Sequence, residues 1–302
     1  MKTSRRTFLA MTSAAATCAV TTAQAATPMA TRAIPKSKEM LPVIGLGSSK
    51  AVQQIVDTGP QPLAGVLRKL VAHGGKVVDT WPRNPVNDAR FGKIINIPEF
   101  AGKLFITGKI DRPGKEAGLA QFRDTQAAYG RKTLDLLQVF SLTDIGVHWP
   151  SLRAIKDAGE ARYIGATVSE DKLHEALAAF LEKEAPDTVQ MNYSISERAV
   201  ESRLLLLAAD KGAAVIVNRP FMNGDLFAKL QTKPLPPFAA EIGCKSWAQY
   251  SLKYILGHPA VTCVLAETTN PLHMEENADA GNSPLPDAAM RKRMIAYVDE
   301  II

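Results

Sequence analysis

The chain has 302 residues, of which 36 are Lys or Arg and 30 are Asp or Glu, so its formal net charge is +6. Hydrophobic residues make up 46%, enough for one large core, while a charged fraction of 22% with both signs mixed excludes a disordered or coiled-coil protein. The positive excess would suit nucleic acid or another acidic partner only if the basic residues cluster.

The first 25 residues have the form of a secretory signal. Lys2, Arg5 and Arg6 make a basic head, a run of small apolar residues follows, and Ala-Gln-Ala at 23–25 is typical of a cleavage site. The adjacent arginines before Phe-Leu resemble a twin-arginine signal, which exports folded proteins. This apolar run is too short and too weakly hydrophobic for a typical membrane-spanning helix. We therefore expect cleavage, periplasmic release through the twin-arginine export machinery and no stable membrane insertion, with half of the positive excess lost.

The remaining basic residues and the cysteines do not indicate a nucleic-acid-binding or metal-binding protein. The basic run 291–293 is expected on the solvated face of the last helix, and without accompanying aromatic residues it does not indicate nucleic-acid binding. Cys18 leaves with the signal, whereas Cys244 and Cys263 remain, either as a disulfide or as two buried thiols. No Cys/His cluster has metal-ligand spacing, so no metal site is predicted.

After a linker over 26–40, short β-rich runs alternate with helical periods. Strands are expected at 42–47, 77–80, 104–107, 134–140, 163–167, 189–192, 214–218 and 262–265. Helices are expected around 63–71 before Gly74-Gly75, from about 173 to 181 after a capping Ser169, at 202–211 and at 287–302, with a surface loop at 234–238.

The strands are almost continuously apolar, as strands covered on both faces must be. Eight βα units over 41–302 predict an α/β fold, a single-domain (β/α)8 TIM barrel with a closing C-terminal helix. A doubly wound sheet is the competing fold, but Gly45 and Gly47 lack the third glycine of a dinucleotide-binding fingerprint.

In a barrel of this kind the chemistry lies at the carboxyl ends of the strands. Asp79 and Lys109 each end an apolar strand, and adjacent strands bring them close together. A half-buried carboxylate and ammonium must be paired, so the two form either a structural plug or part of a reactive site. Other polar residues at strand ends are Thr167, Gln190, Asn192, Asn218, Glu267 and Thr268.

Six segments in chain order resemble the aldo-keto reductases, which are TIM-barrel oxidoreductases that use NAD(P)H. They are 78–80, 106–109, 135–139, 162–165, 190–194 and 268–277. The resemblance implies reduction of carbonyl compounds or oxidation of alcohols. In that family a Tyr acts as general acid, a Lys paired with an Asp lowers the pKa of that Tyr, and a His orients the carbonyl.

By this resemblance, only two of the four catalytic residues of the family are present in this sequence. Asp79 and Lys109 occupy the Asp and Lys positions, whereas Asn84 replaces the Tyr and Phe140 replaces the His. An amide can hydrogen-bond an oxyanion but cannot protonate an alkoxide, and general acid catalysis is commonly worth about 10² to 10⁴ in rate. His148, expected in the loop after the fourth strand, is a possible substitute acid.

The resemblance also implies a cofactor site. Thr167 and Gln190 match residues that hydrogen-bond the nicotinamide amide, Asn218 stands where many relatives stack a Tyr, and Glu276 and Asn277 match adenine contacts. Glu267, followed by Thr268, stands where NADPH-using relatives place a basic residue, and its charge would repel a 2′-phosphate. NADH is therefore favoured over NADPH.

Two functions remain open from the sequence. One is a periplasmic oxidoreductase that uses Lys109 or an ordered water as proton source and Asn84 as oxyanion partner. The other is a non-catalytic barrel that binds a small molecule or a dinucleotide. An aldolase-like Lys109 that forms a Schiff base is disfavoured, because Asp79 would keep that amine protonated.

Overall fold

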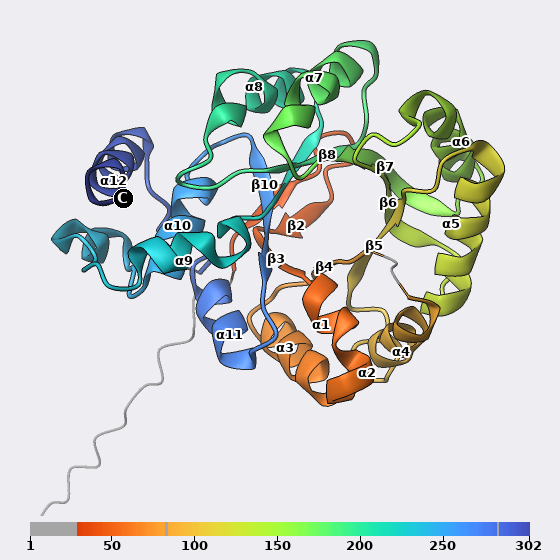
Figure 1. Ribbon diagram of the computed structural model, residues 1–302, viewed down its shortest axis with the longest axis horizontal. Helices are drawn as coiled ribbons and strands as arrows, with labels where there is room; N and C mark the ends of the chain where they lie inside the picture. Colours follow the sequence, from red (N-terminus) through yellow and green to blue (C-terminus); the bar gives the residue numbers. More distant parts are fainter. Residues whose placement is uncertain (1–28, 82–83, 283) are drawn as a thin grey trace, which may run out of the picture.

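Eight parallel strands close into a barrel with helices on its outside (Figure 1). The computed structural model describes residues 29–81, 84–282 and 284–302, so the expected signal at 1–25 lies outside them. The barrel strands are β3 (Ile44–Gly47), β4 (Val77–Asp79), β5 (Phe105–Ile110), β6 (Leu134–Phe140), β7 (Ala161–Thr167), β8 (Thr188–Asn192), β9 (Ala214–Asn218) and β10 (Val261–Glu267). They pair in chain order, and β10 pairs with β3 to close the ring. The predicted TIM barrel is confirmed, with all eight strands near their expected positions.

The helices follow the strands in alternation. They are α1 (Ser49–Gln53), α2 (Ile55–Thr58), α3 (Gln61–Ala72), α4 (Pro85–Ile95), α5 (Lys115–Tyr129), α6 (Ile145–Asp157), α7 (His174–Lys183), α8 (Leu204–Asp210), α9 (Asp225–Leu230), α10 (Trp247–Leu256), α11 (Pro271–Asp279) and α12 (Ala288–Ile301). Short 3-10 turns occupy Asp171–Leu173, Ala199–Ser202, Met222–Gly224 and Pro237–Ile242, the last of which begins within the expected loop at 234–238. None of the helices in the described ranges is long and apolar enough to cross a membrane.

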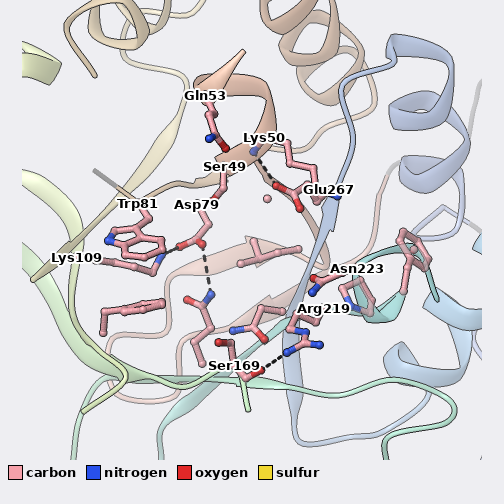
Figure 2. Close-up of a pocket in the computed structure, with 18 of the residues that line it drawn as sticks. Ser49, Lys50, Gln53, Asp79, Trp81, Lys109, Ser169, Arg219, Asn223 and Glu267 are labelled. Carbon is pink, nitrogen blue, oxygen red and sulfur yellow. Dashed lines mark hydrogen bonds and ion pairs between the residues drawn. The ribbon is translucent and has the colours of Figure 1, made fainter. Parts of the chain in front are cut away.

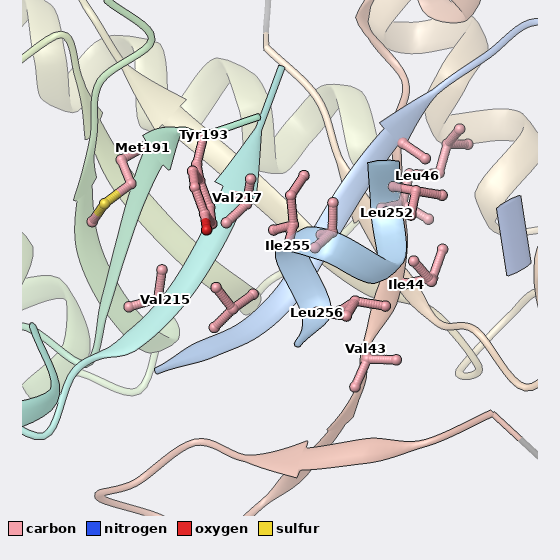
Figure 3. Close-up of a cluster of buried hydrophobic side chains, with 14 of the residues drawn as sticks. Val43, Ile44, Leu46, Met191, Tyr193, Val215, Val217, Leu252, Ile255 and Leu256 are labelled. Atoms are coloured by element: carbon pink, nitrogen blue, oxygen red, sulfur yellow. The ribbon is translucent and has the colours of Figure 1, made fainter. Parts of the chain in front are cut away.

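The apolar side chains form two cores, one on each face of the strands. The outer core lies between the barrel and its helices, and Figure 3 shows Leu252, Ile255 and Leu256 of α10 beside Ile44 of β3 and Val217 of β9. The inner core fills the barrel with residues that include Val77, Phe105, Leu136, Tyr163 and Ile216. Burial on both faces explains why these strands lack the polar alternation of a half-exposed sheet.

The segment predicted as a linker forms part of the fold. Strands β1 (Thr31–Ala33) and β2 (Met40–Pro42) pair as an antiparallel hairpin. Ile34 and Leu41 of this hairpin are fully buried in the inner core, so they cover the amino-terminal end of the barrel. The linker prediction missed the hairpin because each of its strands is only three residues long, too short to show a period.

The prediction that residues 291–293 all face solvent is wrong for Arg291. Met294 and Val298 pack α12 against the barrel, and the helical spacing turns Arg291 to the same side. Its guanidinium donates to the Tyr193 hydroxyl at 2.7 Å and to Glu201 at 2.8 Å. Lys292 and Arg293 are exposed as expected.

Two further local predictions are resolved by the structure. Cys244 and Cys263 are both buried free thiols, so the disulfide alternative does not occur. Ser169 does not cap α7, because a 3-10 turn over Asp171–Leu173 intervenes and starts after Glu170. Ser169 instead lines the pocket at the carboxyl ends of the strands.

Candidate active site

A cavity of about 540 Å³ opens at the carboxyl ends of the barrel strands (Figure 2). It is lined by residues at the ends of the strands, by α1 and by the segments that follow β4, β7 and β9. Its lining residues are Gly47, Ser49, Lys50, Gln53, Asp79, Trp81, Lys109, Phe140, Ser169, Gln190, Asn218, Arg219, Pro220, Phe221, Asn223, Gly224, Phe227, Leu265 and Glu267. Six of the residues predicted from the sequence are therefore brought together, namely Asp79, Lys109, Phe140, Gln190, Asn218 and Glu267.

An ion pair between Asp79 and Lys109 forms the floor of the cavity. Asp79 is 7% exposed and Lys109 is 2% exposed, and the Lys109 ammonium donates to Asp79 Oδ1. Thr107 Oγ1 also donates to that oxygen at 2.6 Å, while Gln190 Nε2 lies 3.3 Å from Oδ2. Two charges at this depth are tolerated because each has a partner and further hydrogen bonds.

The ammonium of Lys109 has donor capacity in the direction of the cavity. Among the described residues it donates to Asp79 and to the Thr80 carbonyl oxygen, which is 3.2 Å away. A lysine ammonium carries three N–H donors. Since Lys109 also lines the cavity, its third N–H is placed to meet an oxygen of a bound molecule.

An aromatic wall borders this floor. The rings of Trp81 and Phe140 stack with centroids 4.4 Å apart and an interplanar angle of 20°. The Trp81 indole N–H donates to Asp111 Oδ2 at 2.8 Å, which fixes the orientation of the ring. Phe140, which the resemblance places at the position of the family's His, therefore gives this side of the cavity an apolar face.

Asn84 is placed differently from the role we expected for it. Its side-chain oxygen accepts hydrogen bonds from the backbone N–H groups of Val86, at 2.9 Å, and Asn87, at 3.4 Å. It is the N-cap of α4, with Pro85 in the first helical position, a common combination at helix starts. Asn84 is exposed and does not line the cavity. The structure gives it a capping role and shows no contact that would make it an oxyanion partner.

The side of the cavity formed by β8 and β9 carries unpartnered amide oxygens. Within the described residues, Gln190 Oε1 and Asn218 Oδ1 are buried without a hydrogen-bond partner, although Asn218 Nδ2 donates to the Val168 carbonyl at 2.9 Å. Arg219 follows with a positive φ of 53° and donates from Nη1 to the Ser169 carbonyl at 2.6 Å. A bound group with amide N–H donors and an anionic portion would satisfy these positions.

Glu267 lies at the rim next to the start of α1. Its Oε1 accepts a hydrogen bond from the backbone N–H of Lys50 at 2.9 Å, as the dashed line in Figure 2 marks. Gly47 stands opposite Glu267 across β3 and β10, where an added Cβ would lie only 3.3 Å from the Cβ of Glu267. This fixed carboxylate gives the rim a negative charge beside the cationic side chains of Lys50 and Arg219.

Four other predicted site residues lie outside the cavity lining. Thr167 is fully buried on β7 opposite Phe140, and its hydroxyl has no partner among the described residues. Thr268 follows β10 and accepts from the Asn270 N–H, whereas Glu276 and the buried Asn277 belong to α11.

The expectation that His148 occupies a loop and could swing into the site is wrong. His148 is fully buried inside α6, and its Nε2 lies 2.9 Å from the Arg112 carbonyl. It also packs against Gly118 of α5, where an added Cβ would lie 2.4 Å from its ring. His148 therefore holds two helices together and is not available as an acid.

Several lining residues were not predicted from the sequence. Among them, Trp81 and Arg219 matter most for the chemistry of the cavity. Both lie one or two positions beyond the end of a barrel strand, so extending the strand-end rule into the following loop would have included them. Lys50 and Gln53 lie on α1, in a segment without periodicity. Among the described residues no cluster of His, Cys, Asp or Glu could hold a metal ion.

Comparisons with known proteins agree with this architecture. The model of the family described as "Aldo/keto reductase family" matches residues 43–298. An aldo-keto reductase from Bacillus halodurans in its holo form is similar with a TM-score of 0.72 and 18% identity, over 89% of this chain and 96% of the other. An aldo/keto reductase from Klebsiella pneumoniae in complex with NADP and acetate has a TM-score of 0.71 and 17% identity, over 86% and 92%.

One curated relative is similar over a shorter segment. The NADH-specific methylglyoxal reductase of Escherichia coli (strain K12) is 28% identical over 164 residues, which are 45% of this chain and 49% of that protein. The chain thus matches about half the length of this relative. The family match covers most of the residues, including the Asp79–Lys109 floor and all eight barrel strands. The chain belongs to the aldo/keto reductase family.

Proposed function

We propose that the protein binds a nicotinamide dinucleotide in the cavity and reduces a small carbonyl compound at the Asp79–Lys109 floor. The observation that carries this proposal is the buried ion pair, which lines an open cavity and keeps an ammonium directed at it. An ion pair that served stability alone would not need a cavity of about 540 Å³ beside it.

The lining residues fit a dinucleotide. The unpartnered oxygens of Gln190 and Asn218 suit the carboxamide N–H groups of a nicotinamide, and the guanidinium of Arg219 with the Asn223–Gly224 loop suits a pyrophosphate. When bound, such a cofactor supplies a hydride. Lys109 would hold the substrate oxygen and donate a proton to it, while Asp79 and Thr107 keep the ammonium in place.

We further propose a preference for NADH. Glu267 lies at the rim where a carboxylate would repel a 2′-phosphate, and the partial relative from Escherichia coli is described as NADH-specific. Glu267→Gln removes the charge but keeps an oxygen for the Lys50 N–H. It should raise the affinity for NADPH about tenfold relative to NADH. Glu241→Gln, a change at an exposed ion pair with Arg293, is the matched control and should leave the ratio unchanged.

The reductase activity is tested by following nicotinamide absorbance with a panel of activated carbonyl compounds. Because Phe140 and Asn84 supply no acid, we expect turnover slower than that of a complete catalytic set by about 10² to 10⁴. Lys109→Met should abolish the remaining turnover, whereas Lys183→Met on α7 should not change it. Turnover that survives Lys109→Met would contradict the proposal.

A second function is favoured by the aromatic wall and the capping role of Asn84. Neither Tyr nor His is among the described residues that line the cavity, so a barrel of this kind would bind a dinucleotide or small molecule without converting it. This non-catalytic protein would show saturable binding and no absorbance change with any carbonyl of the panel. The two functions therefore differ in turnover and not in binding.

We also propose that the chain is exported in folded form to the periplasm by the twin-arginine machinery. The proposal rests on Arg5-Arg6 before Phe-Leu and the Ala-Gln-Ala sequence at 23–25. Replacing Arg5 and Arg6 together by Lys should leave the full-length precursor in the cytoplasm, as measured by cell fractionation. Normal export of that variant would contradict it.

A further inference from the structure

A second cavity lies on the outside of the barrel, in the layer of helices formed by α2, α3 and α4. It is a groove of about 400 Å³, and α2 contacts both of the other helices (Figure 1). The groove is distinct from the cavity at the strand ends. Gln53 on α1 is the last residue of this segment that lines the strand-end cavity, and the lining of the groove begins at Ile55 on α2. The proposed function therefore makes no use of the groove.

The apolar part of the groove is open because α2 ends after a single turn. Gly59 has a positive φ of 72° and Pro60 follows it, so the chain turns into α3 and does not continue the helix. Among the apolar lining residues, Ala64 of α3 is 5% exposed and Ile94 of α4 is 4% exposed, whereas Val56 of α2 is 48% exposed. The groove thus offers buried apolar side chains with an exposed valine beside them.

The charged residues that line the groove are all cationic. They are Arg68 on α3 and Arg90 and Lys93 on α4, and no acidic residue of the described chain lines it. Arg68 is paired with Glu99 at 2.9 Å. The side chains of Arg90 and Lys93 have no ion-pair or hydrogen-bond partner among the described residues, and their spacing of three places them on one side of α4. This combination of apolar surface and two available cations is complementary to a ligand with an alkyl chain and one negative charge.

We propose that the groove binds a single-chain fatty carboxylate. The alkyl chain packs on Ile55 and Ile94. The carboxylate accepts hydrogen bonds from Arg90 and Lys93, since charge-assisted pairs of this kind are the strong ones.

The size of the groove favours a small ligand over a protein partner. Its volume of about 400 Å³ lies within the usual range for small-molecule sites, about 300 to 1,000 Å³. A stable protein interface needs about 20 to 30 residues on each side. Only 11 described residues line the groove.

Calorimetric titration of the protein with decanoate tests this inference, with hexanoate, decanol and decylammonium as comparisons and all four kept below micelle-forming concentrations. We expect one decanoate per chain, bound at least about tenfold more tightly than hexanoate, because each buried methylene adds up to about fourfold in affinity. Decanol should bind more weakly for lack of a charge, and decylammonium more weakly still because the two cations repel it. Equal affinities for decanoate and decylammonium, or no binding of decanoate at millimolar concentration, would overturn the inference.

A double variant places the bound carboxylate. Arg90→Gln with Lys93→Gln should weaken decanoate about tenfold and leave decanol unchanged, because only the charged ligand uses these two side chains. Lys183→Gln with Lys292→Gln, which removes the same charge from exposed positions of α7 and α12, is the matched control and should change neither affinity. Unchanged decanoate binding in the groove variant would refute the proposed contact.

Two single variants distinguish the groove from the cavity at the strand ends. Val56→Glu adds a negative charge at an exposed lining position and should weaken decanoate while the protein stays folded. Arg219→Ala, in the strand-end cavity, should leave decanoate binding unchanged. Loss of decanoate binding in Arg219→Ala but not in Val56→Glu would place the ligand in the other cavity and contradict the inference. Neither result depends on whether the chain binds a dinucleotide.

Discussion

At the scale of single residues, the Asp79–Lys109 pair combines stability and chemistry. Both side chains are almost completely buried, so removing one charge leaves the other without compensation. Lys109→Met should lower the free energy of unfolding by about 3 to 5 kcal/mol. The double variant Asp79→Asn with Lys109→Met removes both charges and should be considerably more stable than Lys109→Met alone.

Denaturant unfolding of the natural chain, of each single variant, Asp79→Asn and Lys109→Met, and of the double variant gives the coupling free energy between the two residues. A double variant that is less stable than Lys109→Met would contradict the assignment of the pair as a mutually compensating buried ion pair. The double variant also separates loss of turnover from loss of fold, because it should lack activity while remaining folded.

Asn84 illustrates a residue whose role the sequence alone did not reveal. Its position relative to Asp79 matched a catalytic Tyr, but the following Pro85 and the N–H groups of α4 give it a capping function. Asn84→Ala should lower the free energy of unfolding by about 1 kcal/mol. Asn84→Asp, which can still accept from the N–H groups of α4, should keep most of that stabilisation.

Ligand binding is the second readout for Asn84. Because its side chain does not line the cavity, Asn84→Ala should leave nicotinamide and ketone affinities unchanged. A tenfold loss of either affinity with intact folding would instead support the oxyanion role that the sequence suggested.

At the scale of elements, the amino-terminal hairpin is tied to the barrel by Glu39. Its carboxylate pairs with Lys76 and Arg162 and accepts from the Tyr163 hydroxyl at 2.7 Å. Burial opposes ionisation of Glu39, but the Tyr163 hydroxyl and the two cations outweigh it and hold the pKa of Glu39 below its ordinary value. A carboxylate with a lowered folded-state pKa stabilises the fold above its unfolded pKa of about 4.3, and this contribution is lost as the pH falls through the folded-state value.

Glu39→Gln should therefore destabilise the protein by about 1 kcal/mol near neutral pH, and the difference from the natural chain should shrink below about pH 4. Urea unfolding of both proteins across this range measures the difference. Glu241→Gln, at an exposed ion pair, should show a much smaller effect throughout. A deficit for Glu39→Gln that grows on acidification would show that the sign of the linkage is wrong.

The elements also show what sequence patterns capture. The eight barrel strands were predictable because burial on both faces makes each one an apolar run, and α12 because of its length. The hairpin and α1 were missed, since three to five residues carry no periodicity. Arg291 and His148 were misplaced because the burial of a polar residue depends on partners far away in the chain, such as Glu201 and Arg112.

At the scale of the whole molecule, the positive net charge does not define the function. Half of the excess belongs to residues 1–25, and the cavity combines the carboxylates of Asp79 and Glu267 with the cations Lys50, Lys109 and Arg219. The family and its barrel could be inferred from the order of the strand ends. The pairing of Trp81 with Phe140 could not, because stacking across β4 and β6 requires the geometry of the closed barrel.

Equilibrium titration of the protein with NADH, followed by nicotinamide fluorescence, tests the central claim most directly. The fit of Gln190, Asn218 and Arg219 to a dinucleotide predicts saturable binding of one NADH per chain, with NADPH bound more weakly because of Glu267. Arg219→Ala should weaken both, and Lys183→Ala should weaken neither. The absence of saturable binding for either dinucleotide would contradict the proposal that this cavity serves a nicotinamide-dependent reductase.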